Sequence, residues 1–306
     1  MSVISLGSIN MDLVVRTPRF ANPGETIVGL DFYTAPGGKG ANQAVAVGRL
    51  GVEVLMFGRI GDDFFGRNLL KNLQENNVGT KGVKIANTLP TGTALITVDK
   101  NAENIIIIIP GANSAVGDSD INNLLPFFKK GNILMLQLEI PLDTVAAAAK
   151  KAKENGVKVL LDPAPARELP DELLRLCDFI TPNETEAQML TGVKIENTMD
   201  AKKAAEALLA KGVQAVIVKM SSKGSYYYDG SIEILFPAYK VDAVDTVAAG
   251  DAFNGGFAAA FTEGKSMEEI MQWANACGAL STTKPGAQPS MPSREELISF
   301  MKENPR

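Results

Sequence analysis

The sequence predicts an α/β protein whose core is a doubly wound, mostly parallel sheet with helices on both faces, accompanied by a small β-sheet lid. Two observations predict this fold. Short runs rich in Val, Ile and Leu alternate with longer helical patterns, and strands that are apolar on both sides belong to parallel sheets covered by helices. In two regions this alternation breaks, because extended segments follow each other with no helix between them.

Taken in order, the β-branched runs indicate strands at 3–7, 53–58, 133–137, 158–162, 179–181 and 215–220. The helical patterns between and after them lie at 41–50, 64–76, 142–155, 199–211 and 250–263. The chain carries no low-complexity linker, charge block or internal repeat that would indicate a second independent domain. We therefore expect one domain over residues 1–306.

The predicted lid comes from the two regions without helices. Residues 12–17 and 26–33 are extended patterns joined by a Pro/Gly loop, while 91–98 and 104–109 are joined by the turn-like Asp99-Lys100-Asn101-Ala102. Both pairs, at about 12–34 and 91–110, are insertions between core elements. We expect them to cover the carboxyl ends of the parallel strands, where open α/β sheets bind ligands. A lid that excludes water suits phosphoryl transfer.

Composition narrows the chemistry. With 45% hydrophobic and 21% charged residues the chain is not disordered, and no apolar run approaches the roughly 18 residues of a membrane span. The start Met-Ser-Val-Ile-Ser-Leu-Gly has no basic region before an apolar stretch, so we expect no secretory signal and a cytoplasmic protein. A formal charge of −5 argues against a nucleic-acid binder.

The chain contains no histidine, which excludes Ser-His-Asp hydrolysis, His-ligated zinc and histidine acid–base catalysis together. Proton transfer must therefore use a carboxylate, Lys, Tyr or Cys. Cys177 and Cys277 have the spacing of neither a disulfide framework nor a metal site, and we expect them to be buried small residues.

The segment Asp245-Thr-Val-Ala-Ala-Gly-Asp251-Ala-Phe-Asn-Gly-Gly256 sets small residues and an acid where a helix is predicted to begin. Its backbone N–H groups from Val247 to Gly250 can approach an anion, which the positive end of the helix also favours. Asp251 would repel phosphate there unless it acts on a neutral hydroxyl that attacks the phosphoryl group. In isolation, an acidic helix N-terminus after a small-residue loop is the favoured alternative.

A second segment, Pro36-Gly-Gly-Lys39-Gly-Ala-Asn42-Gln43, leads into the helix at 41–50. It departs from a Walker loop, because Gly40 follows Lys39 where a magnesium-binding hydroxyl would stand. Its glycines let the backbone approach a ligand, and Asn42 offers both a donor and an acceptor to sugar hydroxyls. A glycine-rich helix cap explains the segment equally well.

Other polar residues follow predicted strands. Asn10 and Asp12 share a face of an extended segment and suit a vicinal diol, although an Asx-rich turn is the simpler explanation of the bare motif. Glu139 lies at the carboxyl end of the strand at 133–137. Asn183 and Glu186 fit a helix capping box, which competes with a role for Glu186 at Mg²⁺.

Two C-terminal segments complete the set of candidates. Lys219 to Gly224 follows a strand and ends in a hairpin turn, a suitable floor for a nucleotide. A Gly/Pro-rich loop near Asn275 carries carbonyl groups that suit a monovalent cation or an adenine edge, although an ordinary surface loop is the default. Its residues of interest are Ser281, Lys284, Gly286 and Ser290.

Together and in this order, these motifs resemble the ribokinase family of carbohydrate kinases, also called the phosphofructokinase B family, over essentially the whole chain. The resemblance is carried by residues 37–42, with Gly48 and Gly51 downstream, and by residues 245–251, with Asn183 and Glu186 between the two segments. Within the family, the segments at 8–12, 37–42 and 284–290 favour ribose as the sugar.

The resemblance implies in-line transfer of the γ-phosphoryl group of MgATP to the C5 hydroxyl of D-ribose, which yields ribose 5-phosphate and ADP. Asp251 would be the base, and the N–H groups of Ala248, Ala249 and Gly250 the anion hole. The implied sugar contacts are Asn10, Asp12, Gly38, Lys39, Asn42, Glu139 and Asp251. The implied ATP contacts are Asn183, Lys219, Ser221, Ser222, Lys223, Gly224, Gly250 and Asn275. The implied ligands of an activating K⁺ are Asp245, Val247, Ser281, Lys284, Gly286 and Ser290, and Glu186 would hold Mg²⁺ through water.

Asn275 departs from the family's pattern, because some relatives have His at this position.

The nearest alternative function is a fructokinase or a 2-keto-3-deoxygluconate kinase with the same base. Asn10, Asp12, Asn42 and Glu139 favour a small polyol over a nucleoside, whose base would need aromatic partners. A dinucleotide-binding oxidoreductase is disfavoured, since no Gly-X-Gly-X-X-Gly follows the first strand and no ribose-binding acid lies about 20 residues later. A silent sugar-binding regulator would lack Asp251 or the anion-hole glycine.

Family members often pair through their lid sheets, so the resemblance also implies a homodimer. Apolar residues at alternate lid positions are consistent with that pairing, although lid strands also need an apolar side toward the sugar. These residues are Leu95, Ile105, Ile107 and Ile109.

Overall fold

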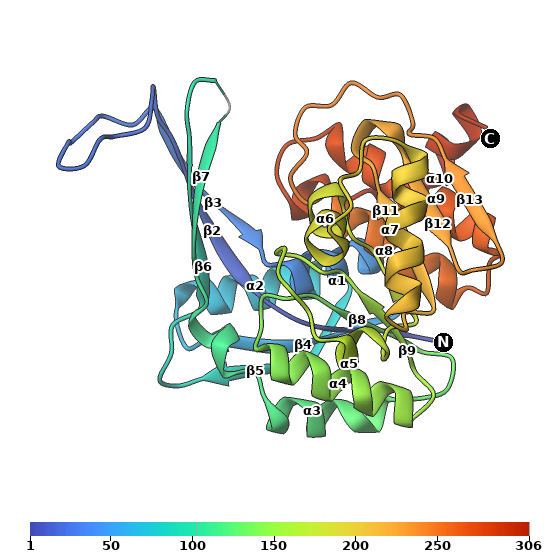
Figure 1. The fold of residues 1–306 in the computed structure, drawn as a ribbon. Coiled ribbons are helices and arrows are strands. Elements are labelled where there is room, and N and C mark those ends of the chain that lie inside the picture. The colour runs from blue at the N-terminus through green and yellow to red at the C-terminus, as the bar shows by residue number, and fades with distance from the viewer. Residues whose placement is uncertain (102, 306) are drawn as a thin grey trace.

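The protein is described by a computed structural model that covers residues 1–101 and 103–305. An α/β body carries a second, smaller sheet that stands away from it (Figure 1). The body's nine-stranded sheet has the order β13-β12-β11-β10-β9-β8-β1-β4-β5. Its strands are β1 Val3–Leu6, β4 Val54–Gly61, β5 Val78–Ala86, β8 Ile133–Leu136, β9 Lys158–Leu161, β10 Phe179–Ile180, β11 Ala215–Lys219, β12 Ser225–Tyr228 and β13 Glu233–Phe236.

The seven strands β11, β10, β9, β8, β1, β4 and β5 are parallel to their neighbours in this sheet, and β12 and β13 add an antiparallel hairpin at one edge. One face of the sheet is covered by α1 Lys39–Arg49, α2 Phe64–Glu75, α8 Ala249–Thr262, α9 Met267–Thr282 and α10 Arg294–Glu303. The other face is covered by α3 Asp118–Leu124, α4 Leu142–Glu154, α5 Asp171–Leu174, α6 Glu184–Thr191 and α7 Thr198–Ala210. The predicted doubly wound fold is confirmed.

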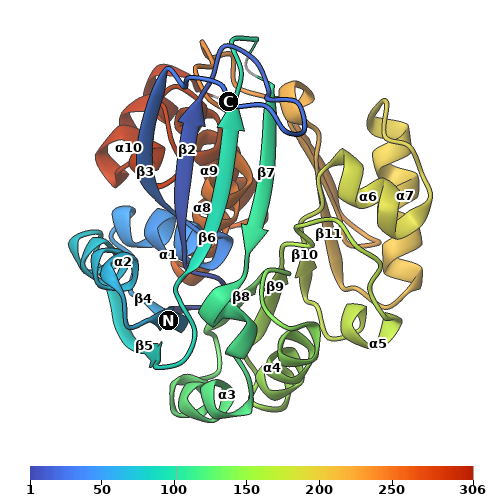
Figure 2. The ribbon, with the colours of Figure 1, turned by 90° about the vertical axis from the view of Figure 1, so that its left-hand side faces the viewer.

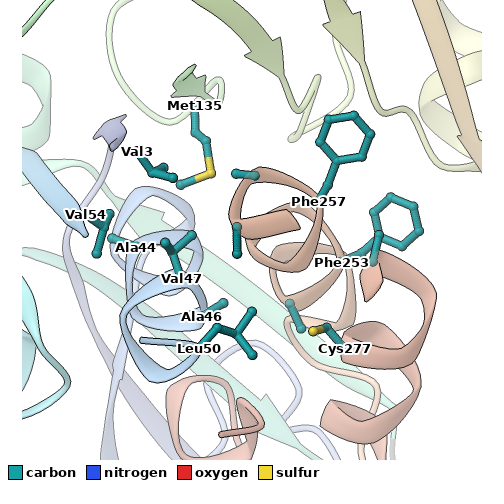
Figure 3. Packing of buried hydrophobic residues seen from close by; sticks show 14 of the residues in the cluster. Val3, Ala44, Ala46, Val47, Leu50, Val54, Met135, Phe253, Phe257 and Cys277 are labelled. Carbon is teal, nitrogen blue, oxygen red and sulfur yellow. The ribbon is translucent and has the colours of Figure 1, made fainter. Parts of the chain in front are cut away.

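Side-chain alternation along the strands fills two separate cores. In β1, Val3 joins the core beneath α1 and α8, while Ile4 joins the core beneath α4 and α7. Figure 3 shows Val3 and Met135 of the sheet near the α1 and α8 side chains of the first core. Among the described residues, none of the helices has the length and apolar content needed to cross a bilayer.

Helices α1 and α8 pack very closely, and small residues make this possible. A Cβ on Gly255 of α8 would overlap the side chain of Ala46 in α1. The close approach holds the first turns of both helices at the same edge of the sheet, which matters for the site described below. Both helices are buried along most of their length, so their sequences lack the polar stripe of a surface helix.

The lid is a four-stranded sheet with the order β3-β2-β6-β7, which faces the viewer in Figure 2. Its strands are β2 Asn10–Arg16, β3 Asp31–Gly37, β6 Gly92–Val98 and β7 Asn104–Ile109. Only β2 and β6 run parallel to each other. At the foot of the lid, Asn10 stands opposite Gly37 on one side and Gly92 on the other. Asn10 and Asp12 lie in a strand, so the Asx-turn alternative is wrong.

The lid also differs from its prediction at one strand. The segment expected at 26–33 becomes a strand only at Asp31, because the ladder with β2 begins where Asp31 stands opposite Arg16 and continues to Gly37. The turn after β6 is closed by Asp99, whose carboxylate accepts from the backbone N–H groups of Asn101 and Glu103. Ala102 of that predicted turn lies outside the described residues, as does Arg306.

Candidate active site

The candidate site lies where the winding of the sheet reverses. Strand β1 has β8 on one side and β4 on the other. From β1 the chain continues through β4 to β5 at one edge, and from β8 it continues in the opposite direction through β9 and β10, so the winding reverses between β1 and β8. Ser8 follows β1 and Glu139 follows β8, and the Ser8 hydroxyl donates to Glu139 Oε2 at 2.5 Å. The Lys39 N–H donates to the same oxygen at 3.2 Å. Ligands of open α/β sheets bind at such a reversal.

The glycine segment presses against the foot of the lid. Gly38 has φ +87°, and a Cβ there would lie 2.7 Å from the Asn10 nitrogen. A Cβ on Gly37 would overlap the carboxylate of Asp12. The glycines therefore let α1 begin directly beneath the strand that carries Asn10 and Asp12, as a close backbone approach requires.

Asp251 stands in the first turn of α8, as predicted, and is 4% exposed. Its Oδ2 accepts from Asn42 Nδ2 and its Oδ1 from Gln43 Nε2, both at 3.0 Å. Burial raises the pKa of Asp251, an effect that Lys39 opposes and Asp162 reinforces. The two amide donors also favour the ionised carboxylate. Asp251 is thus a buried carboxyl group held in one orientation, with a raised pKa.

Lys39 is the cation at the centre of these carboxylates. Burial lowers the pKa of Lys39, but four nearby acids outweigh it and raise the pKa above its ordinary value. Lys39 therefore stays charged at neutral pH and offsets part of the negative charge. The acids are Asp251, Asp162, Glu139 and Glu186. Burial, Glu139 and Asp251 together raise the pKa of Asp12 to about 7.

A cavity of about 160 Å³ opens beside Asp251. Side chains of both charges line it. The basic ones are Lys39 and Lys219, and the acidic ones are Asp162, Glu186 and Asp251. Lys219 Nζ pairs with Asp162 Oδ1 at 3.0 Å. The cap and the first two residues of α8 complete the wall, and their N–H groups belong to the positive end of a helix. These residues are Ala248, Ala249 and Gly250.

The loop before α8 differs in one respect from its prediction. The N–H of Val247, expected to face an anion, instead donates to Asp245 Oδ1 at 3.0 Å. The Ala249 N–H makes a long bond of 3.3 Å to the Thr246 carbonyl. Ala248 caps α8 in the left-handed conformation, with φ 59° and ψ 14°. This strained turn aims the start of α8 at the small cavity.

A larger cavity of about 480 Å³ shares Asn183, Lys219 and Gly250 with the small one. Its volume lies in the range of small-molecule sites. Most residues expected to contact ATP line it: Asn183, Lys219, Ser221, Ser222, Gly224, Gly250 and Asn275. Lys223 is the exception, because its Nζ turns away to the Glu196 carbonyl at 2.6 Å. Asn275 is buried and exchanges hydrogen bonds with Ser225.

The capping box at α6 is confirmed. Asn183 Oδ1 accepts from the Glu186 N–H at 2.8 Å, and Glu186 Oε2 accepts from the Asn183 N–H at 2.8 Å. Burial raises the pKa of Glu186, while Lys219 opposes this effect. Within residues 1–101 and 103–305, no cluster of three or more His, Cys, Asp or Glu side chains is arranged to hold a metal ion.

The residues expected at a monovalent cation fall on two joined segments. Asp245 links them, because its Oδ2 accepts from the Gly286 N–H at 2.9 Å while its Oδ1 binds Val247. The predicted loop contains Lys284 and Gly286, but Ser281 lies within α9 and Ser290 in the 3-10 turn Gln288–Ser290. The expectation of a loop at Ser281 was wrong because α9 continues to Thr282.

Sequence reasoning missed several residues of this site. Asp162 ends a predicted strand at the same edge as Glu139, so its position alone was a signal. Gln43 lies inside the glycine segment but was given no role. Asn113, whose Nδ2 donates to Asn10 Oδ1 at 2.7 Å, carries no local signal. The same holds for the apolar wall of the larger cavity, which includes Ala238, Val241, Phe253 and Ala279.

The chain is similar in sequence to a family of carbohydrate kinases over nearly its whole length. The family model described as pfkB family carbohydrate kinase matches residues 1–294. The chain is 43% identical over 296 residues to ribokinase of Haemophilus influenzae, with 97% of each chain covered. It is 39% identical over 305 residues to deoxyribokinase of Salmonella typhi, with 99% of this chain and 100% of the relative covered.

Solved structures agree with the sequence relatives. Ribokinase from Thermotoga maritima superposes with a TM-score of 0.90 at 40% identity, and 99% of both chains is covered. Arabidopsis thaliana ribokinase, complexed with ribose and ATP, superposes with a TM-score of 0.92 at 35% identity, with 98% of both chains covered.

Proposed function

The chain belongs to the pfkB family of carbohydrate kinases, and from this premise we propose that it transfers the γ-phosphoryl group of ATP to the C5 hydroxyl of D-ribose. The products are ribose 5-phosphate and ADP. The observation that carries the proposal is Asp251, a buried carboxylate between the sugar-side residues and the small charged cavity. Full-length similarity to ribokinases supports the choice of ribose.

In the proposed reaction, Asp251 takes the proton of the attacking hydroxyl. A positioned general base contributes about 10²- to 10⁴-fold to such a step, and the raised pKa of Asp251 suits it to receive the proton. Lys39 and the N–H groups at the start of α8 stabilise the charge of the transferring group. The sugar is held by side chains at the foot of the lid and beneath it. These are Asn10, Asp12, Lys39, Asn42 and Glu139.

The nucleotide occupies the larger cavity. Apolar residues such as Val241 and Phe253 suit the adenine ring, and the shared wall at Asn183, Lys219 and Gly250 directs the phosphates toward the small cavity. The carboxylates of Asp162 and Glu186 line that cavity, which fits Mg²⁺, an ion that prefers oxygen ligands and retains water. Bound there, Mg²⁺ would neutralise phosphate charge.

A monovalent cation, K⁺, fits the two segments joined by Asp245. The carboxylate of Asp245 holds Val247 and Gly286 through their N–H groups, which leaves carbonyl oxygens of both segments as ligands of the type such ions use. The cation would stiffen the loop that leads into α8. The proposed ligands are Asp245, Val247, Ser281, Lys284, Gly286 and Ser290.

We also propose a homodimer that forms through the lids. The side chains of β7 are exposed on both faces of the lid sheet, from 37% at Ile109 to 58% at Ile107. Leu95 of β6 and Phe32 of β3 are also exposed, at 42% and 60%. A contiguous apolar surface of this kind marks an interaction site in a water-soluble protein. Sedimentation of the purified protein tests this, and a monomer at micromolar concentration contradicts it.

The substrate is tested by a coupled ADP-release assay against ribose, 2-deoxyribose, fructose, 2-keto-3-deoxygluconate and a nucleoside. We expect the highest kcat/KM for ribose, with phosphorus NMR locating the product phosphate on C5. The deoxyribokinase relative makes 2-deoxyribose the second candidate. If ribose fails and another sugar is phosphorylated, the substrate proposal is wrong and the kinase chemistry stands.

A further inference from the structure

Four buried amide side chains form two hydrogen-bonded chains, each of which ends at one carboxylate oxygen of Asp251. On one arm, Gln288 Nε2 donates to Asn42 Oδ1 at 3.0 Å, and Asn42 Nδ2 donates to Asp251 Oδ2 at 3.0 Å. On the other, Gln137 Nε2 donates to Gln43 Oε1 at 2.8 Å, and Gln43 Nε2 donates to Asp251 Oδ1 at 3.0 Å. We call these four residues the amide relay. Asn42 and Gln43 are its inner residues, and Gln288 and Gln137 its outer residues.

The charge of Asp251 fixes the direction of every bond in the relay. An ionised carboxylate only accepts hydrogen bonds, so the NH₂ groups of Asn42 and Gln43 must face it and their carbonyl oxygens must point away. The Gln43 NH₂ group also donates to Asp162 Oδ2 at 3.0 Å, which strengthens the same orientation. Each inner oxygen then needs a donor from the protein, and the outer glutamines supply one each.

Water cannot easily replace those outer donors. Asn42 is 6% exposed and the other three relay residues are 2% exposed or less. A buried amide oxygen that loses its donor costs free energy. An inner amide with no outer partner would also be free to turn over, and would then present its oxygen to the carboxylate of Asp251.

The outer glutamines are themselves held in place from other elements. Gln288 Oε1 accepts from Asn72 of α2 at 2.5 Å. Gln137 keeps its NH₂ group on Gln43 although its own Oε1 has no hydrogen-bond partner within residues 1–101 and 103–305. Gly7 accommodates this oxygen, because a Cβ at Gly7 would overlap it. The surroundings of Gln137 therefore keep its NH₂ group on Gln43, even though this leaves the Gln137 oxygen without a hydrogen bond.

We propose that Gln288 and Gln137 are positioning residues for phosphoryl transfer, which act on Asp251 through Asn42 and Gln43 respectively. By fixing the inner amides, they hold the carboxylate plane of Asp251 in one orientation and leave the remaining lone pairs of Asp251 directed at the sugar hydroxyl. The inference rests on the proposed function, since it assumes that Asp251 is the base.

The relay also favours the ionised state of Asp251. The charged groups around Asp251 have opposite effects on its ionisation. Lys39 of α1 favours the ionised form, whereas Asp162 after β9 and Asp12 of β2 disfavour it. Glu139, Glu186 and Lys219 lie at the same site. Since the relay donors favour the anion, loss of an outer glutamine raises the pKa of Asp251. The acid limb of the kcat profile then moves to higher pH.

The test compares Gln288→Met and Gln137→Met with the wild type. We expect each to lower kcat about tenfold, the effect of one buried hydrogen bond, with an unchanged KM for ATP and an acid limb shifted upward by about half a pH unit or more. Arg49→Met is the matched control. Arg49 donates to the backbone carbonyls of Gln288 and Pro289 at 3.3 Å but does not donate to an amide of the relay. Its kcat and pH profile should match the wild type.

A double-mutant cycle separates positioning from general destabilisation. If Gln288 acts through Asn42, then Gln288→Met causes no further loss of kcat in an Asn42→Leu background, whereas Gln137→Met still does. Independent losses, or a lower kcat with an unmoved acid limb, would overturn the inference. Circular dichroism checks folding, and if one Met variant does not fold, the cycle on the other arm, made with that arm's own inner residue, gives the same decision.

Failure of the inference is distinct from failure of the proposed function. If the wild type does not phosphorylate ribose, the substrate proposal fails and the relay is tested with the sugar that the enzyme accepts. If the wild type turns over ribose and both Met variants match its kcat and pH profile, only the relay is refuted.

Discussion

Sugar affinity is expected to weaken as the pH falls below 7, because Asp12 titrates near neutrality. Burial is the main cause of its raised pKa, followed by the charges of Glu139 and Asp251, and together they bring the pKa from 3.8 to about 7. Asp12 is proposed to accept hydrogen bonds from sugar hydroxyls, which the ionised carboxylate does best. Affinity is therefore present above the raised pKa and is lost as the pH falls through it.

The size of the effect follows from the ionised fraction. With a pKa of about 7, roughly ten-elevenths of Asp12 is ionised at pH 8 and roughly one-eleventh at pH 6, so the dissociation constant rises about tenfold between them. An acid with an ordinary pKa near 4 would be fully ionised over that whole range. At pH 7, binding should also release about half a proton.

Isothermal titration of ribose without ATP, from pH 6 to pH 8, measures this dependence. Buffers with different ionisation enthalpies report the released proton. The control is Asp12→Asn, which should bind ribose more weakly and with no pH dependence over this range. A wild-type affinity that changes less than about twofold would refute the reasoning. An Asp12→Asn variant with the wild-type slope would show that Asp12 is not the group that titrates.

Three further predictions concern the base, the glycine segment and the cation. Asp251→Asn should lower kcat by about 10²- to 10⁴-fold with little change in ribose binding, and near-normal turnover in the ADP-release assay would rule out Asp251 as the base. Gly38→Ala should destabilise the fold by about 3 kcal/mol, because the site combines φ +87° with a Cβ 2.7 Å from the Asn10 nitrogen; an unchanged midpoint of thermal unfolding would contradict this. Replacing K⁺ with Na⁺ at equal ionic strength should lower kcat, and equal rates would be evidence against the cation site.

The sequence predicts best those features that are encoded locally. Helix α8 was placed within one residue of its observed bounds, Ala249–Thr262, because its apolar run is long and its start is marked by small residues. Strand β5 was missed, since Gly79 and Gly82 interrupt its pattern. Both glycines are there for packing, because a Cβ at Gly82 would overlap the ring of Phe57.

The residues of the site also differ in whether a local pattern could have predicted them. Lys39 and Asp251 stand in motifs whose residue types suggest their chemistry. Gln288 and Asn42 are 246 positions apart, and only the fold brings their amides together. No local pattern distinguishes such a glutamine from one on the surface. The same physical limit applies to the raised pKa of Asp12, which depends on burial by the fold and on the charges of Glu139 and Asp251, both far away in the sequence.

The reversal of winding between β1 and β8 places the residues proposed for the sugar and those proposed for the nucleotide in different halves of the chain. Residues proposed for the sugar lie at positions 10–42 and 139, whereas the larger cavity is lined by residues 183–282. A single recombination event within α4, at residues 142–154, would thus exchange nearly the whole sugar side and leave the nucleotide side intact. Asp251 is the exception, because it is proposed to act on the sugar but lies in the C-terminal half. Any such hybrid would also have to preserve the close packing of α8 against α1 at Gly255.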